Sequence, residues 1–139
     1  MDNFITLWRV QDALTNGVAA AGTSDVNGAA ADLTGYNCAV LLVDMGAIAA
    51  TAVTSIKVQE SDDDRNWTDV ADSSVTIADD DDNETFIWEH THPLKRYIRM
   101  VLDRGTANAA VNQAIWLLGK PSYGPVTQPS GVTTKLLHK

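Results

Sequence analysis

The residues best placed to bind a metal ion are two histidines, His90 and His92. Side chains at positions i and i+2 of a strand point the same way, so this pair could chelate Zn²⁺. A third ligand would come from Glu89, His138 or an acidic loop, and the spacing selects none of them. Pro93 ends the strand directly after the pair. The favoured interpretation is therefore a polar strand end, and a zinc enzyme built on these histidines ranks last among the alternatives.

Two acidic runs are the next candidates for chemistry. Asp79–Asp82 is followed by Glu84, and Asp62–Asp64 precedes Arg65. Ca²⁺ takes about six to eight oxygen ligands from a compact loop, but neither run has the glycine and glutamate offsets of an EF-hand loop. Both runs are predicted to be solvated loops. A cation held between them, if the two loops lie side by side, stays an alternative.

The sequence contains no signature of nucleophilic catalysis. Cys38 is the single cysteine, and it begins the apolar run Cys38–Val43, which favours a buried core thiol over a reactive one. Neither a Gly-x-Ser-x-Gly elbow nor a Gly-x-x-x-x-Gly-Lys phosphate loop occurs. The acids cluster in polar loops, without the apolar pocket that a glycosidase acid needs. We therefore expect a protein that binds rather than catalyses, and one that needs no cofactor.

Four tryptophans offer a different chemistry, the stacking of sugar rings on an exposed indole. Trp67 and Trp88 flank the acidic loops and form the candidate glycan platform. Trp8 and Trp116 lie in apolar segments nearer the chain ends. Because a tryptophan more often belongs to a core or an interface, that is the default interpretation for all four.

The elements that would position these residues are predicted to be strands. Val53–Glu60 and Glu84–Thr91 alternate with the period of a half-buried strand, and Tyr36–Val43 predicts a strand buried on both faces, or nearly so. Further strands are predicted at Arg96–Leu102, with Ile98, Met100 and Leu102 pointing inward, and at Val111–Leu118. Several strands separated by polar turns favour an all-β fold, a jelly-roll-like antiparallel β-sandwich with extended N- and C-terminal arms.

Three segments are expected along the 139 residues, a length that suits one domain able to fold without a disulfide or a metal. Residues 1–35 would form an N-terminal arm and edge strands, with Phe4–Val10 as a short strand or an arm. Residues 36–118 would form the sandwich core. Residues 119–139, which proline and glycine punctuate, would form an extended tail.

Charge is distributed unevenly along the chain, whose net charge is −8. Residues 60–93 carry twelve acids and one base, and residues 94–139 carry one acid and seven bases. The acidic middle should repel nucleic acid, whereas the basic last third could meet an acidic partner or the acidic face of a neighbouring copy. No basic-then-apolar leader occurs, and no apolar run approaches about 20 residues. We therefore expect no membrane partner and synthesis in a cytoplasm.

One part of the chain resembles a known family. Ile56–Val70 reads as a strand, the run Gln-Glu-Ser-Asp-Asp, a short turn and then Trp-Thr-Asp-Val. Downstream, Arg96-Tyr97-Ile98-Arg99 is followed by the turn Gly105-Thr106-Ala107 and a last strand. Over residues 36–126 the chain thus resembles small β-sandwich proteins of tailed-phage structural gene clusters, some of which are capsid decoration (cement) proteins. The same motifs also occur in discoidin-like and carbohydrate-binding sandwiches.

The resemblance implies a virion structural protein, made in the host cytoplasm, that binds the capsid surface and stabilises capsomer contacts. Its partners would be the major capsid protein and copies of itself, as a homotrimer. The partner-binding residues expected from it are Arg96, Tyr97 and Arg99 at an inter-subunit face, and Trp8, Tyr123, Leu136 and Leu137 near the chain ends against the shell. The two arginines could equally pair with carboxylates of their own chain. The open alternative is a carbohydrate-binding module that uses Trp67 or Trp88, with Ca²⁺ at the aspartate loops.

Overall fold

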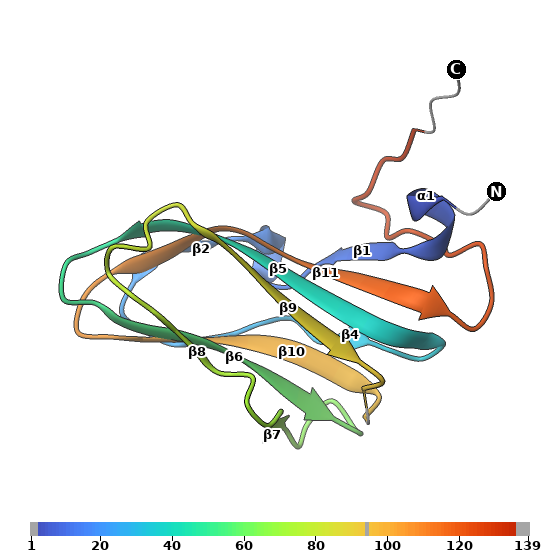
Figure 1. Ribbon diagram of the computed structural model, residues 1–139, viewed down its shortest axis with the longest axis horizontal. Helices are drawn as coiled ribbons and strands as arrows, with labels where there is room; N and C mark the ends of the chain where they lie inside the picture. Colours follow the sequence, from blue (N-terminus) through green and yellow to red (C-terminus); the bar gives the residue numbers. More distant parts are fainter. Residues whose placement is uncertain (1–2, 94, 136–139) are drawn as a thin grey trace.

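Two antiparallel β-sheets pack face to face in a computed structural model that describes residues 3–93 and 95–135 (Figure 1). The first sheet has the order β1 (Arg9–Asp12), β11 (Ala109–Pro121), β5 (Tyr36–Ile48), β9 (Thr85–Thr91), and β2 (Ala19–Gly22) also pairs with β11. The second sheet has the order β3 (Val26–Asn27), β10 (Tyr97–Gly105), β6 (Val53–Ser61), β7 (Thr68–Asp69), with β4 (Ala31–Asp32) on β10 and β8 (Val75–Ile77) on β6. The all-β antiparallel sandwich predicted from the sequence is confirmed.

Helical structure is confined to a one-turn helix, α1 (Phe4–Leu7), and a 3-10 turn, η1 (Thr15–Gly17), in the described ranges. The strand alternative for Phe4–Val10 is therefore wrong for the first half of the segment, which is helical. The turn forms because the Asn3 side chain accepts a hydrogen bond from the Thr6 backbone N–H at 3.2 Å and so caps the helix. Neither helical element has the length and apolar character needed to cross a membrane.

Alternation along β6 and β10 determines how the second sheet meets the core. Met100 pairs with Val58, and Leu102 pairs with Ile56, so the apolar residues of the two strands share one face. Ile98, Met100 and Leu102 are fully buried, which confirms the predicted inward face of this strand. Each such side chain stabilises the fold by roughly 1.5–3 kcal/mol relative to leaving it in water.

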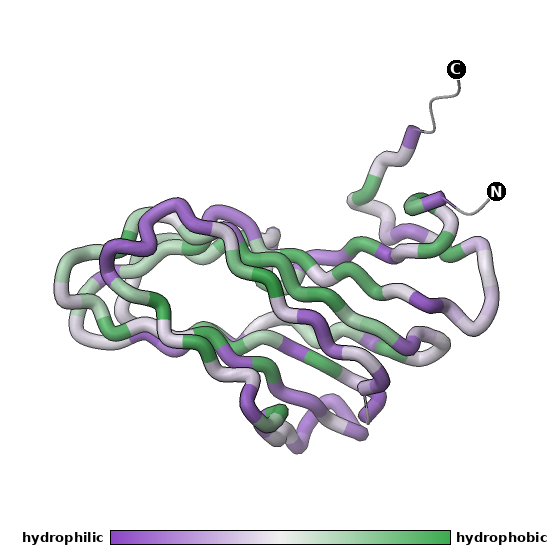
Figure 2. Tube along the Cα trace, viewed as in Figure 1, coloured by the Kyte–Doolittle hydropathy of each residue, from purple (hydrophilic) through white to green (hydrophobic). Residues whose placement is uncertain are grey.

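The first sheet contributes the two longest strands, β5 and β11, which lie side by side at its centre. Their inward side chains include Leu41, Val43, Trp116 and Leu118, each at most 1% exposed. Figure 2 shows these central strands as largely hydrophobic along their length. Cys38 on β5 is also buried, as predicted, and burial together with the neighbouring Glu89 carboxylate raises the pKa of its thiol.

The two ends of the sandwich are built differently. At the loop end lie the turns at residues 49–52, 78–84 and 105–108. The Ala49 N–H donates to the Asn108 carbonyl, and the Thr51 N–H donates to the Asp79 carboxylate, so the first turn is bonded to both of the others. At the terminal end lie α1, the turn at Gly35 and the chain that follows β11 (Figure 1). The N–H of Ser122 donates to Gly35 there, and the N–H of Val126 donates to Thr6. Residues from both ends of the sequence therefore meet at the terminal end.

Candidate docking surface

Arg96 and Arg99 both have partners within the chain. The Arg96 guanidinium donates two hydrogen bonds to the Asp32 carboxylate, at 3.1 and 2.8 Å, and this pair ties the start of β10 to β4. The same hydrogen bonds hold the pKa of Asp32 well below its usual value of 3.8. The Arg99 guanidinium donates to the Gln59 side-chain oxygen at 2.9 and 2.7 Å, and burial lowers its pKa. The Arg96–Asp32 pair is the intrachain carboxylate pairing that the sequence had left open, whereas Arg99 binds an amide oxygen instead of a carboxylate.

The aromatic rings beside these arginines are each covered on one side. The guanidinium carbon of Arg96 lies 4.8 Å from the Tyr97 ring centroid, and that of Arg99 lies 4.4 Å from the Trp67 ring. Such cation–π contacts occupy a ring face that a sugar would otherwise stack against. Tyr97 and Trp67 are also half-buried. Arg96, Tyr97, Arg99 and Trp67 therefore form a surface of the second sheet in which most side chains already contact one another.

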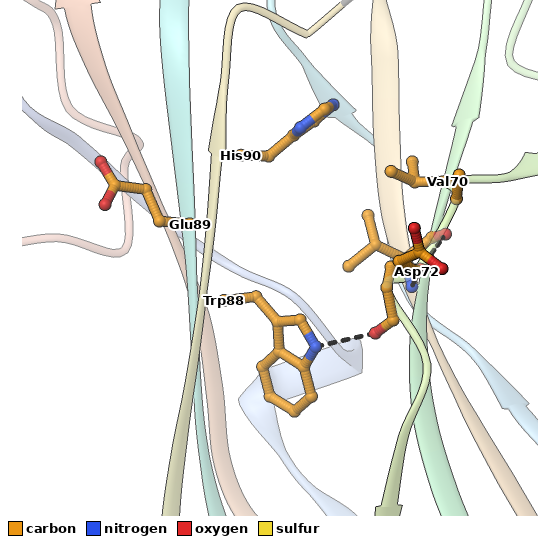
Figure 3. Close-up of a pocket in the computed structure, with 8 residues that line it drawn as sticks. Val70, Asp72, Trp88, Glu89 and His90 are labelled. Carbon is orange, nitrogen blue, oxygen red and sulfur yellow. Dashed lines mark hydrogen bonds between the residues drawn. The ribbon is translucent and has the colours of Figure 1, made fainter.

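Trp88 lies at an opening between the two sheets (Figure 3). Its indole N–H donates to the Ser73 carbonyl oxygen at 2.9 Å, which joins β9 to the segment between β7 and β8. The opening is a cavity of about 170 Å³ whose lining residues are Val58, Val70, Ala71, Asp72, Ser73, Trp88, Glu89 and His90. Because the indole is half-buried and hydrogen-bonded to the backbone, a sugar would have to enter this cavity rather than stack on a flat platform.

His90 and His92 belong to different local structures. His90 lies in β9 on the inward side, with its Nε2 atom 3.9 Å from the Glu60 Oε2 atom of the other sheet. His92 follows the strand with a φ of 55°, in the left-handed region, so the alternation that would align it with His90 is broken. Among residues 3–93 and 95–135, no three histidine, cysteine, aspartate or glutamate side chains come together as a metal site.

The acidic runs build turns. In the loop 78–84, the Asp79 carboxylate accepts the Thr51 N–H at 2.8 Å, and the Asp82 carboxylate accepts the N–H of Ile48. In the loop after β6, the Asp63 carboxylate accepts the N–H groups of both Arg65 and Asn66, at 3.0 and 2.8 Å. Backbone donors in tight turns need such acceptors, which explains why aspartate recurs in these loops.

Trp8 covers the outer side of the first sheet at the terminal end. Its ring occupies the space above Gly119, where a Cβ atom would collide with the indole carbons. Phe4 stacks on the same indole, with ring centroids 6.1 Å apart and planes 11° apart. Gly119 therefore provides the seat for Trp8, and Trp8 in turn holds α1 against the sheet.

The side chain of Gln128 attaches the C-terminal tail to the N-terminal segment. Its Oε1 atom accepts the Val10 N–H at 2.9 Å, and its Nε2 atom donates to the carbonyl oxygens of Ile5 and Trp8. The Val126 N–H adds a bond to Thr6 at 3.0 Å. Sequence reasoning missed Gln128, because a single glutamine in a Pro- and Gly-rich stretch carries no periodic signal.

Between this attached tail and the end of the sandwich lies an open cleft of about 370 Å³. Its lining residues are Arg9, Thr34, Gly35, Tyr36, Pro121, Tyr123, Pro125, Val126 and Thr127. Tyr123 is 91% exposed, and the Nε atom of Arg9 is buried with no hydrogen-bond partner in the described chain. Two of the predicted shell-facing residues, Trp8 and Tyr123, thus lie at the terminal end, while Leu136 and Leu137 fall outside the described residues.

The outer face of the first sheet is the second surface that sequence reasoning missed. It is lined by outward aliphatic side chains, which are Val10, Val40, Leu42, Ile87, Ile115 and Leu117. Tyr36–Val43 was predicted to be buried on both faces, or nearly so; its inward side chains are buried, whereas Val40 and Leu42 on this side are partly exposed. The sequence signal for this surface was the unbroken apolar run of β5, because a strand that packs on one side only should alternate between apolar and polar residues.

Comparisons with known proteins bear on the fold. No family model matches the chain, and no curated protein matches it. Among solved structures, the crystal structure of PBSX exported protein XepA superposes with a TM-score of 0.56 and 16% sequence identity. The match covers 100% of this chain and 46% of that one, so the chain spans about half the length of XepA. At this level of identity, the likeness shows a shared β-sandwich fold.

Proposed function

We propose that this chain is a phage virion structural protein that decorates the assembled capsid and stabilises contacts between capsomers. Its partners would be the major capsid protein and other copies of the chain, as a homotrimer on the shell. The role is one of binding, with no catalysis. The sequence resemblance over residues 36–126 motivates the proposal, and the fold likeness to PBSX exported protein XepA is in keeping with it.

The observation that carries the proposal is the construction of the terminal end. A rigid two-sheet body holds both terminal segments at one end, where they surround an open cleft and expose Phe4 (52%) and Tyr123 (91%). Exposed aromatic rings on a preorganised support are typical anchors of a protein interface. Because Gln128 and Trp8 already hold these segments in place, docking would order few further residues and so lose little entropy.

The glycan-binding alternative has less support from the geometry. One ring face of Trp67 lies under the Arg99 guanidinium, and the Trp88 indole is tied to Ser73. A glycan ligand would therefore depend on the small cavity beside Trp88.

The test is co-sedimentation with capsid shells that lack this protein, assembled from the major capsid protein of the same phage. The double variant Phe4→Ser/Tyr123→Ser should bind at least about tenfold more weakly, since each aromatic anchor contributes a kilocalorie or more. Val53→Ser is the matched control, because Val53 is 65% exposed and lies towards the loop end. Equal binding by the wild type and the double variant, or no binding by the wild type at saturating concentration, would contradict the proposal.

A further inference from the structure

The outer face of the first sheet presents two apolar rows that run across neighbouring strands. In one row, Val10 pairs with Leu117, which pairs with Val40. In the next row, Ile115 pairs with Leu42, which pairs with Ile87. Directly paired residues of an antiparallel sheet point to the same side, so each row is continuous.

This apolar face is exposed to solvent at its β9 side. Ile87 is 66% exposed, the highest value among the exposed aliphatic side chains of the described residues. In an antiparallel strand with one face in water, the residues on that face are normally polar. Contiguous apolar rows on such a surface therefore mark an interaction site.

The charges on the same face are acidic. Glu89 pairs with Val40 at the β9 end of the first row, and Asp12 pairs with Ile115 at the β1 end of the second row. Asp44 points outward in the next row along β5. The outward positions of β1, β5 and β9 hold no lysine or arginine. Two such faces placed against each other would oppose like charges, so a symmetric face-to-face dimer is disfavoured. The face instead fits a segment that is apolar and basic.

The last eight residues of the chain have this composition. Residues 132–139 read Val-Thr-Thr-Lys-Leu-Leu-His-Lys, with two lysines, two leucines and no acid. At about 3.3 Å per residue an extended stretch of this length spans roughly 26 Å. Crossing the four strands of the sheet takes about 15 Å at the usual strand spacing.

The described part of the tail approaches the edge of this face and then leaves it. Gln128 fixes the tail beside β1, and Pro129, Gly131 and Val132 border a cavity of about 180 Å³ with Val10 and Asp12. From there to Lys135 the tail runs away from the sheets (Figure 1), and residues 133–135 are exposed. The described tail therefore borders the rows at Val10, and it leaves Ile87 at the far side of the face exposed.

We propose that the outer face of the first sheet is the docking site for the C-terminal segment, residues 132–139, of a second copy of this chain. Leu136 and Leu137 would cover the apolar rows, and the two lysines would pair with Asp12, Asp44 or Glu89. The contact is heterologous, because the tail of one copy binds the sheet of another. Copies can therefore assemble into a closed ring or exchange their tails with each other. It needs no capsid and does not depend on the function proposed above.

The test uses the chain of 139 residues and a fluorescein-labelled peptide of residues 130–139. The double variant Leu136→Asp/Leu137→Asp supplies a chain whose own tail is disabled. Its binding of the peptide, measured by fluorescence anisotropy, should weaken at least about tenfold when Ile87→Lys is added, because an apolar contact is lost and a like charge is introduced. Val53→Lys is the matched control, since Val53 is 65% exposed against 66% for Ile87 and lies on the other sheet.

Light scattering separates the possible occupants. The wild-type chain should show a mass that rises with concentration, and the Leu136→Asp/Leu137→Asp variant should stay monomeric. A peptide that fails to bind, or that binds the Ile87→Lys and Val53→Lys variants equally, overturns the site. A peptide that binds while the wild type stays monomeric at every concentration means that the tail covers its own face, which overturns the assignment to a second copy. Unfolding temperatures within a few degrees of the wild type establish that each variant is folded.

Discussion

Replacing Gln128 by alanine should release the C-terminal tail without unfolding the sandwich. The side chain makes three hydrogen bonds, to the Val10 N–H and to the carbonyl oxygens of Ile5 and Trp8. A hydrogen bond contributes a net of about 0.5–1.5 kcal/mol, and at a half-buried site where water competes the lower half of that range applies. The three together then hold the tail by about 2 kcal/mol, which corresponds to roughly a 30-fold change in the opening equilibrium.

Hydrogen exchange followed by NMR measures this opening directly. The Val126 N–H donates to the Thr6 carbonyl at 3.0 Å only while the tail is attached, so its exchange should become about 30-fold faster in Gln128→Ala. Amides of the central strand β5 should keep their wild-type rates, because the opening is local and leaves the core intact.

Thr127→Ala is the control for this experiment, since Thr127 is exposed and makes no side-chain hydrogen bond in the described structure. An unchanged exchange rate at Val126 in Gln128→Ala would refute the attachment of the tail through this side chain. Faster exchange throughout β5 would refute the separation between tail and core.

Three further predictions concern the rest of the molecule. Asp32→Asn should make the stability of the fold less sensitive to acid. Arg96 lowers the folded-state pKa of Asp32, so the ionised carboxylate stabilises the fold at pH values above 3.8, the usual pKa of aspartate. That stabilisation is lost as the pH falls through the folded-state pKa. Urea midpoints at pH 3 and pH 7 measure this. Gly119→Ala should displace Trp8 and lower stability by about 1–3 kcal/mol, with a red-shifted tryptophan emission. The Cys38 thiol, buried and with a raised pKa, should react with a thiol reagent at pH 8 only after denaturation.

Each of these predictions has a control or a contradicting result. Asp80→Asn should leave the pH dependence of stability unchanged, because no hydrogen bond to its side chain is present in the described chain. Gly131→Ala places a methyl group in open space and should leave tryptophan emission unchanged. A rapid reaction of the native thiol would contradict the burial of Cys38.

Local alternation made part of the fold predictable. Ile98, Met100 and Leu102 point inward because every second residue of β10 is apolar, and that period is written in consecutive residues. The burial of Cys38 followed in the same way from the apolar run that contains it. The all-β sandwich then follows from several such strands separated by polar turns.

Features that depend on contacts between distant residues were not predictable. The packing of the Trp8 ring over Gly119 brings the two ends of the sequence together, and the local sequence around either residue does not identify the other. The hydrogen bond from Val10 to Gln128 spans 118 positions of the chain. A one-turn helix such as α1 depends on one cap, from Asn3, and is too short to show a helical period.

The exposed face of the first sheet illustrates a different limit of pattern reading. Val40 and Leu42 look like residues of a doubly buried strand, and their neighbours Ile115 and Ile87 are apolar too. Whether a second layer covers them is decided by where the remaining chain packs, which strand periodicity does not encode.

Cryo-electron microscopy of phage particles with and without the gene for this chain tests the proposed function most directly. The difference map should show density on the outer surface of the capsid, repeated at symmetry-related positions, with the terminal end of each sandwich against the shell. Identical head surfaces in the two particles, or difference density confined to the tail, would contradict the assignment to capsid decoration.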